Sequence, residues 1–182
     1  MKVHKTNILN SIIIEPDIHT DERGLFLESW NENNFQKIIN LKYNFVQDNH
    51  SKSIKGVLRG LHYQLLNPQG KLIRVVSGEV IDVVVDMRKS SPTFGKHLTI
   101  NLSEYNFKIL WVPPGCAHGF FVTSKEAVLL YKTTDYYNPK DEYCIIWNDP
   151  TLNIDWSLKG IKPKLSVKDK KGKFFLNAKT YE

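Results

Sequence analysis

Two short segments of the sequence hold residue types that could move protons. In Gly56–Gln64, Arg59 and His62 interrupt a pattern that is otherwise typical of a β-strand. In Pro113–Phe120, a turn-forming start leads to His118. A neutral imidazole has a pKa of about 6.5 and can accept a proton at neutral pH. Each histidine is therefore either a structural group with its own hydrogen bonds or a member of a catalytic site.

The segment Gly56–Gln64 also predicts which side chains point the same way. Side chains alternate between the two faces of a strand. One face is expected to hold Leu58, Gly60, His62 and Gln64, and the other Arg59, Leu61 and Tyr63. A polar group without partners inside a barrel costs several kcal/mol. The presence of Arg59 and Gln64 beside His62 therefore favours a site over an isolated structural histidine.

The spacing of the histidines argues against a metal centre. The string P-x-G-x-x-H that ends at His118 resembles a motif of the cupin superfamily, in which the histidine points into a small barrel. Metal-binding cupins resemble H-x-H followed shortly by Glu, but here Gln64 replaces the second histidine, and Pro68 or Gln69 stands where Glu is expected. The remaining pair, His62 and His118, lacks a carboxylate, whereas a catalytic divalent metal usually has about three protein ligands. We therefore expect no metal.

Two further residues could complete an acid–base reaction. Tyr131 lies in the strand-like segment Leu130–Thr134, where it could donate a proton to a substrate or simply anchor the strand through its ring. Lys71 could stabilise an enolate oxygen or be an ordinary surface lysine. Without a metal, the histidines are free for proton transfer, which works better when an aspartate holds the second ring nitrogen.

The composition is that of one folded domain spanning residues 1–182. Hydrophobic residues make up 41% and charged residues 24%, which permits a sizeable core and argues against disorder. The net charge of +6 favours an anionic ligand. Because the basic residues are scattered, nucleic acid is not an expected partner. The one local concentration, Lys159–Lys173, is interpreted as a solvated face.

Neither a membrane nor a secreted location is expected. The apolar run Ile12–Ile14 is interrupted by Glu15 and is too short for a signal peptide or a membrane span. Cys116 and Cys144 cannot form a disulfide framework and lack metal-type spacing, so two buried thiols in a reducing cytosol are expected. The protein is predicted to be cytoplasmic.

The elements that must position these residues are mostly strands. Runs rich in β-branched residues, separated by turn-forming residues, recur without helical patterns between them. The predicted strands are Ile73–Val76, Val80–Asp86, His97–Leu102, Lys108–Val112, Gly119–Val122, Ala127–Thr133 and Tyr143–Trp147. The spacing predicts an all-β fold, an antiparallel sandwich or barrel of the jelly-roll kind with a few short helices, and the resemblance of the His118 string to a cupin motif implies that it is cupin-type.

One helix is predicted at Glu32–Asn40, with Asn31 as its cap and Phe35, Ile38 and Ile39 as its apolar stripe. The last ~20 residues are polar and rich in turn formers. They are expected to be a tail that packs late or folds over a site.

Segments along nearly the whole chain match one family in order. They are Asp21–Glu28 (DERGLFLE), Phe45–Ser51 (FVQDNHS), Gly56–Gln64 (GVLRGLHYQ), Gln69–Leu72 (QGKL), Asp82–Arg88 (DVVVDMR), the His118 segment, Tyr131–Tyr137 (YKTTDYY), Trp147–Pro150 (WNDP) and Leu165–Asp169 (LSVKD). Through these motifs the chain resembles the dTDP-4-dehydrorhamnose 3,5-epimerases, cupin-fold enzymes of deoxysugar nucleotide biosynthesis. The order of so many motifs makes the resemblance specific.

The resemblance implies a cofactor-free reaction on a dTDP-linked 4-keto-6-deoxyglucose, inverted at C3 and C5 through an enolate. It implies His62 as the base with Asp169 as its dyad partner, Tyr131 as the acid, and Lys71 as the group that stabilises the enolate oxygen. The implied substrate-binding residues are Arg23, Phe26, Glu28, Gln47, Asn49, Arg59, Lys71, His118, Glu142 and Lys168. It also implies a homodimer in which N-terminal strands cross, so that Phe26 reaches the neighbouring active site.

Three other interpretations stay open at the level of sequence. An epimerase that inverts only C3 or only C5 of a related nucleotide sugar would share the base and much of the phosphate site. A non-catalytic nucleotide-sugar binding protein could use the same scaffold, because a fold does not fix an activity. A metal-dependent cupin is the third, disfavoured by Gln64 and the missing Glu.

Overall fold

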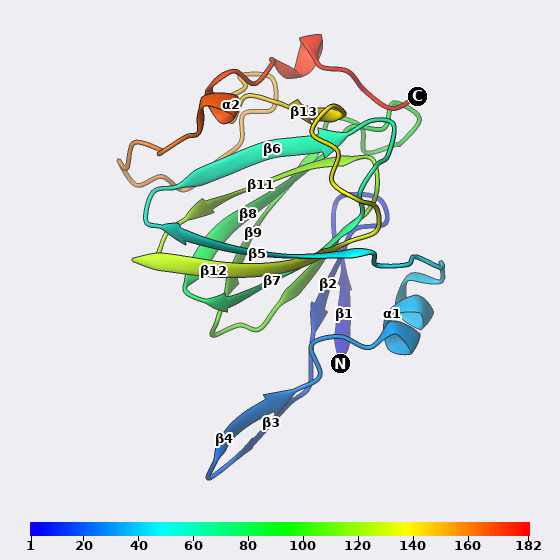
Figure 1. The fold of residues 1–182 in the computed structure, drawn as a ribbon, viewed down its shortest axis with the longest axis vertical. Helices are drawn as coiled ribbons and strands as arrows, with labels where there is room; N and C mark the ends of the chain where they lie inside the picture. The colour runs from blue at the N-terminus through cyan, green and yellow to red at the C-terminus, as the bar shows by residue number, and fades with distance from the viewer.

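Antiparallel pairing arranges most of the chain into two facing sheets, as the computed structural model of residues 1–182 shows (Figure 1). The larger sheet has the order β1-β2-β10-β7-β12-β5 and comprises β1 (Lys2–Lys5), β2 (Ile12–Glu15), β5 (Gln47–Ile54), β7 (Lys71–Ser77), β10 (Ile109–Val112) and β12 (Glu126–Thr133). The smaller sheet has the order β13-β6-β11-β8-β9 and comprises β6 (Leu58–Gln64), β8 (Glu79–Asp86), β9 (His97–Ser103), β11 (Cys116–Val122) and β13 (Glu142–Cys144). The prediction of an all-β jelly-roll sandwich is confirmed.

The predicted strands are present, with some changes in their ends. Only Gly78 separates β7 from β8; its φ is 78°, and a Cβ there would collide with the backbone of Glu126. The predicted strand Tyr143–Trp147 is wrong in extent, because β13 ends at Cys144. Beyond it, Ile145 exchanges two backbone hydrogen bonds with Leu61 of β6, at 2.9 and 3.2 Å, and also bridges to Lys173.

The predicted helix is confirmed as α1 (Glu32–Ile39). The side chain of Asn31 accepts a hydrogen bond from the Asn34 amide, which satisfies one of the free N–H groups of the first turn. Phe35 is the buried member of the apolar stripe and packs in a cluster with Leu72 and Trp111. The helix ends at Asn40, which adopts a left-handed conformation.

The small sheet buries side chains on both of its faces. Between the sheets, apolar residues such as Ile73, Val84 and Phe120 form one core cluster. On the outer face, a second cluster includes Trp156 and Phe175, which come from the segment after β13. The C-terminal segment therefore crosses over the small sheet, as Figure 1 shows. The last ~20 residues, expected to pack late or to fold over a site, include Phe175 of this crossing.

Asp149 anchors this C-terminal crossing. It is buried, and its carboxylate accepts hydrogen bonds from the amides of Leu152 and Phe175 at 2.8 and 2.6 Å. The amide of Leu58 also donates to the carbonyl of Lys164, which fastens the segment to the start of β6. These contacts fix the position of α2 (Val167–Lys170), which packs against β6.

The alternation predicted along β6 is wrong because the strand contains a bulge. His118 of β11 pairs with His62 of β6, but Phe120 pairs with Arg59. A step of two residues along β11 is therefore matched by a step of three residues along β6. The extra residue turns Leu58 to the outer cluster that also holds Leu61. Arg59 instead turns towards the large sheet, where its Nε donates to Ser53 Oγ at 3.2 Å.

Gly60 makes this bulge possible. Its φ is 108°, a conformation that side chains rarely adopt. A Cβ at this position would lie 2.5 Å from the carbonyl oxygen of His118 and 2.6 Å from the Cα of Gly119. The close approach of β6 and β11 thus needs a glycine beside the two histidines.

A two-stranded hairpin, β3 (Ile18–Asp21) and β4 (Gly24–Leu27), projects away from both sheets (Figure 1). Its strands are almost entirely exposed, and Phe26 keeps 71% of its surface accessible. No helix in the structure is long and apolar enough to cross a membrane.

Asp86, at the end of β8, is expected to make the free energy of unfolding depend on pH in the acidic range. It is fully buried and accepts hydrogen bonds from Arg88 Nε at 2.8 Å and from the hydroxyls of Ser91 and Thr93 at 2.6 Å each. Burial raises the pKa of this carboxyl, but the bonds from Arg88, Ser91 and Thr93 outweigh burial and lower it. The charged carboxylate is therefore the stabilising form.

We predict that Asp86→Asn lowers the free energy of unfolding at pH 7 by about 2–4 kcal/mol, because it leaves Arg88 without its buried partner. The folded-state pKa lies below the unfolded value of about 3.9, so the wild-type advantage is complete above about pH 5 and shrinks as pH falls. Urea unfolding of both proteins across this range measures it. The exposed Glu22→Gln is the control, and a deficit that does not change with pH would contradict the assignment.

Candidate active site

A cavity of about 240 Å³ opens between the two sheets, and it is lined mainly by polar side chains. The large sheet contributes residues from β5, β7 and β12, and the small sheet contributes residues from β6 and β13. The lining includes Gln47, Asn49, His62, Lys71, Tyr131 and Glu142. All six are residues that the sequence predicted for the site.

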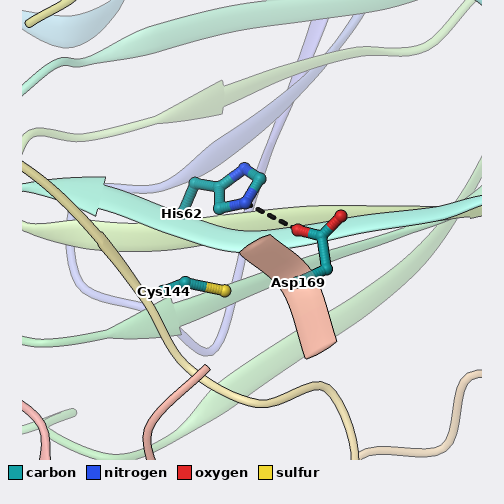
Figure 2. A group of neighbouring side chains, drawn as sticks. All are labelled: His62, Cys144 and Asp169. Atoms are coloured by element: carbon teal, nitrogen blue, oxygen red, sulfur yellow. Dashed lines mark ion pairs between the residues drawn. The ribbon is translucent and has the colours of Figure 1, made fainter. Parts of the chain in front are cut away.

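His62 in the cavity wall forms a close pair with Asp169, although 107 residue numbers separate them. Figure 2 shows Asp169 on α2 facing the imidazole of His62 on β6, and Nε2 of His62 lies 2.7 Å from Oδ1 of Asp169. The same Oδ1 accepts the amide of Gly60 at 3.1 Å, and Oδ2 accepts the hydroxyl of Ser166 at 2.6 Å. Ser166 is the cap of α2, and the reciprocal capping box holds Asp169 in place.

Asp169 stays ionised at this buried position. Burial raises the pKa of its carboxyl, but hydrogen bonds from His62 and Ser166 and the charge of His62 outweigh burial and lower the pKa to about 2. An ionised carboxylate beside Nε2 favours the tautomer with a proton on that nitrogen. The lone pair on Nδ1 is then free to accept a proton.

Glu142 lies on the other side of the imidazole. Its Oε1 is 3.8 Å from Nδ1 of His62, and its Oε2 accepts the Tyr137 hydroxyl at 2.8 Å and pairs with the ammonium of Lys168. Burial raises the pKa of Glu142, but the hydrogen bonds from Lys168 and Tyr137 outweigh it and lower the pKa. His62 is thus flanked by two carboxylates that both remain charged.

Lys71 is a buried cation in the cavity wall and not an ordinary surface lysine. Its side chain is 8% exposed, and its Nζ donates to the carbonyl oxygen of His62 at 3.4 Å. Burial lowers the pKa of Lys71 to about 8, and the charges of Glu142 and Asp82 limit the decrease. At neutral pH the ammonium is therefore still mostly charged, with little water around it.

Tyr131 lines the same cavity as His62, from the opposite sheet. On β12 it lies between Asn49 of β5 and Ile73 of β7. Burial raises the pKa of its phenol, while Arg59 acts in the opposite direction. The phenol is consequently protonated at neutral pH and can serve as a proton donor.

His118 is next to His62 but has a different environment. It lies on β11 directly opposite His62, it is buried, and its Nε2 is 2.9 Å from both carboxylate oxygens of Asp82. The sequence analysis did not select Asp82. The sequence did contain an indication: Asp82 is an acidic residue within a run of β-branched residues. An acidic residue in such a strand is either exposed or paired with another polar group in the interior. Tyr137 was also missed as a cavity residue.

The other predicted binding residues divide into two groups. Near the cavity, Gln47 Nε2 donates to Asn49 Oδ1 at 2.9 Å. Three residues are remote from it within one chain: Arg23 pairs with Asp21, Phe26 is exposed, and Glu28 accepts hydrogen bonds from Asn31 and Asn34. These three lie on or next to the projecting hairpin of β3 and β4.

The fold and the site together define a class: a cupin-type sandwich whose cavity presents an acid–base set of imidazole, carboxylate, phenol and ammonium. The model of the dTDP-4-dehydrorhamnose 3,5-epimerase family matches residues 5–177. A curated dTDP-4-dehydrorhamnose 3,5-epimerase from Pseudomonas aeruginosa is 51% identical over 98% of this chain and 98% of its own length. The chain belongs to the dTDP-4-dehydrorhamnose 3,5-epimerase family, and it is an isomerase.

Solved structures agree with this membership. A dTDP-6-deoxy-D-glucose-3,5-epimerase from Legionella pneumophila, in complex with dTDP-4-keto-L-rhamnose, has a TM-score of 0.95 and 47% identity, covering 98% of this chain and 94% of that one. A 3'-monoepimerase from Streptomyces bikiniensis, in complex with dTDP-quinovose, has a TM-score of 0.91 and 31% identity, covering 96% and 88%. The scaffold is thus shared by enzymes described as inverting one centre and two.

The capping box of α2 predicts a positioning effect. We expect Ser166→Ala to remove the hydroxyl that holds Oδ2 of Asp169 and to destabilise the protein by about 1 kcal/mol. Because the carboxylate loses its fixed orientation against His62, kcat should fall about tenfold or more with little change in KM. Steady-state kinetics measure this. Lys170→Ala, an exposed change on the same helix, is the control, and equal kcat values in the two variants would contradict the effect.

Proposed function

We propose that this protein converts dTDP-4-dehydro-6-deoxy-D-glucose to dTDP-4-dehydro-L-rhamnose by inverting C3 and C5, with no metal and no cofactor. The observation that carries the proposal is that His62 and Tyr131 face one cavity from opposite sheets, with Asp169 bound to the imidazole. A base and an acid on opposite sides of a bound sugar are what inversion requires.

The proposed reaction follows from the environment of each group. The C4 ketone acidifies the hydrogens on C3 and C5, and Nδ1 of His62 removes one of them. Asp169, ionised and 2.7 Å from Nε2, stabilises the imidazolium that forms. The buried ammonium of Lys71 stabilises the enolate oxygen, and such a group can contribute a few kcal/mol in a dry site. Tyr131 then donates a proton to the other face of the carbon.

Cations and amides near the cavity are proposed to hold the nucleotide sugar. Arg59 can meet diphosphate oxygens with two parallel hydrogen bonds. Gln47 and Asn49 line the cavity and offer amide groups to the sugar. His118 would bind through Nδ1, because Asp82 occupies its Nε2.

Two residues at the rim of the cavity complete the proposed binding site. Glu142 and Lys168 pair with each other beside the Tyr137 hydroxyl. In this position Lys168 can exchange its contact with Glu142 for a ligand oxygen, so the rim would adjust when the nucleotide sugar enters.

We also propose that the protein acts as a homodimer in the cytoplasm. Arg23, Phe26 and Glu28 are remote from the cavity of their own chain, and the hairpin that carries Phe26 extends into solvent. In a dimer with crossed N-terminal strands, these residues would complete the neighbouring site around the nucleotide. Both cysteines are free, which is consistent with a reducing compartment.

Solvent exchange tests how many centres react. When the enzyme acts on dTDP-4-dehydro-6-deoxy-D-glucose in deuterated water, we expect deuterium at both C3 and C5 of the product, because each inversion replaces a carbon-bound hydrogen with one from solvent. NMR of the product reads both positions. His62→Ala is the control without a base. Label at one carbon only would support the single-centre epimerase, and no label at either would overturn the proposed function.

Removing the phenol of Tyr131 should slow inversion of the sugar carbons without stopping the exchange of their hydrogens with solvent. In Tyr131→Phe, His62 can still abstract and return a proton on one face, so deuterium should enter while the rate of inversion falls by a factor of about 10² or more. NMR of remaining substrate and product measures both rates. The exposed Tyr105→Phe is the matched control. Inversion at the wild-type rate in Tyr131→Phe would show that another group is the acid.

A further inference from the structure

Cys144 lies against the His62–Asp169 pair and takes no part in the reaction described above. It is opposite His62 in the pairing of β13 with β6, so both side chains emerge on the same face. Figure 2 shows its sulfur directed towards Asp169. Nε2 or Nδ1 of His62, Sγ of Cys144 and a carboxylate oxygen of Asp169 all lie within 4.8 Å of one another.

Three observations indicate that these side chains can bind a metal ion together. Imidazole, thiolate and carboxylate are the three donor types that Zn²⁺ takes in proteins, with bonds of about 2.0–2.3 Å. Donor atoms around a tetrahedral zinc are then about 3.5 Å apart, so Nε2 and Oδ1, now 2.7 Å apart, would separate slightly to admit the cation, and all three donors already lie within 4.8 Å of one another. His62 lines the cavity with 27% of its side chain exposed, so the three donors lie directly behind the cavity wall, although Nε2 itself is buried.

We propose that His62, Cys144 and Asp169 form an inhibitory site for a thiophilic divalent cation of the zinc class. The cation binds Nε2, Sγ and Oδ1; the thiol proton leaves to solvent, and the ring stays neutral because its proton is then carried on Nδ1 instead of Nε2. The fourth position stays open to water or to a ligand from the cavity. This site differs from the metal centre of metal-binding cupins, because it uses neither His118 nor a glutamate of an H-x-H motif.

The charges around Cys144 favour the binding of a divalent cation and disfavour a free thiolate at this position. Burial and, to a smaller extent, the charges of Asp169 and Glu142 raise the pKa of the Cys144 thiol to about 12, while Lys168 opposes them. The negative carboxylates that keep the thiol protonated attract a divalent cation. Because the cation must displace a proton from this thiol, its affinity is reduced at low pH.

Occupation of this site would stop epimerisation. The metal takes Oδ1 of Asp169 away from the imidazole and replaces the proton on Nε2, so the pair can no longer stabilise an imidazolium. This consequence rests on the proposed role of His62 as base, whereas the binding of the cation does not.

Cobalt tests the binding directly. Metal-depleted protein titrated with Co²⁺ should develop the near-ultraviolet charge-transfer absorption of a thiolate–cobalt bond and the visible bands of tetrahedral Co²⁺. Cys144→Ser should lose the charge-transfer band, and Cys116→Ala, which removes the only other thiol, should keep it. Absence of the band in the wild type, or its persistence in Cys144→Ser, would overturn the site.

Inhibition gives the second measurement. Zn²⁺ should inhibit the wild-type enzyme reversibly, with activity restored by a chelator, and Cys144→Ser should need at least tenfold more Zn²⁺ for half-inhibition while its basal rate is unchanged. Equal sensitivity of the two proteins would contradict the inhibitory site. Cobalt binding by a protein without epimerase activity would retain the site and refute the proposed function instead.

Discussion

The contact between Asp169 and His62 is the constraint on which the rest of the structure depends. Asp169 is 2% exposed, and its charged form is stabilised by a hydroxyl and a backbone amide that donate to it and by the imidazole of His62, whose Nε2 lies 2.7 Å away. The same contact decides which imidazole nitrogen carries the proton. The groups that stabilise the buried carboxylate therefore also fix its position against the imidazole of His62.

Much of the fold serves to bring these two residues together. β6 reaches the cavity through a bulge that only glycine at position 60 permits, and this bulge sends Arg59 to the side that faces the large sheet. Asp169 arrives on a segment that crosses the outer face of the small sheet and buries Trp156 and Phe175 there. Apolar burial far from the cavity thus fixes the position of the carboxylate that pairs with His62.

The sequence predicted the strands well where β-branched residues are dense, because such runs favour a single local structure. It failed at Arg59, where strict alternation places the side chain on the wrong face, because a bulge depends on the neighbouring strand β11 and leaves only Gly60 as a local sign. The family motifs brought Asp169 into the site. Neither Asp82 nor Tyr137 was identified, because the partners that reveal them, His118 and Glu142, are distant in sequence.

The protonation state of the imidazole of His62 is the most direct test of this account. Nitrogen-15 NMR of histidine-labelled protein, with the His62 signals assigned by their loss in His62→Gln, distinguishes the two ring nitrogens at neutral pH. The account predicts a protonated Nε2 facing Asp169 and an unprotonated Nδ1. A neutral ring that carries its proton on Nδ1, with Nε2 bare beside the carboxylate, would contradict it.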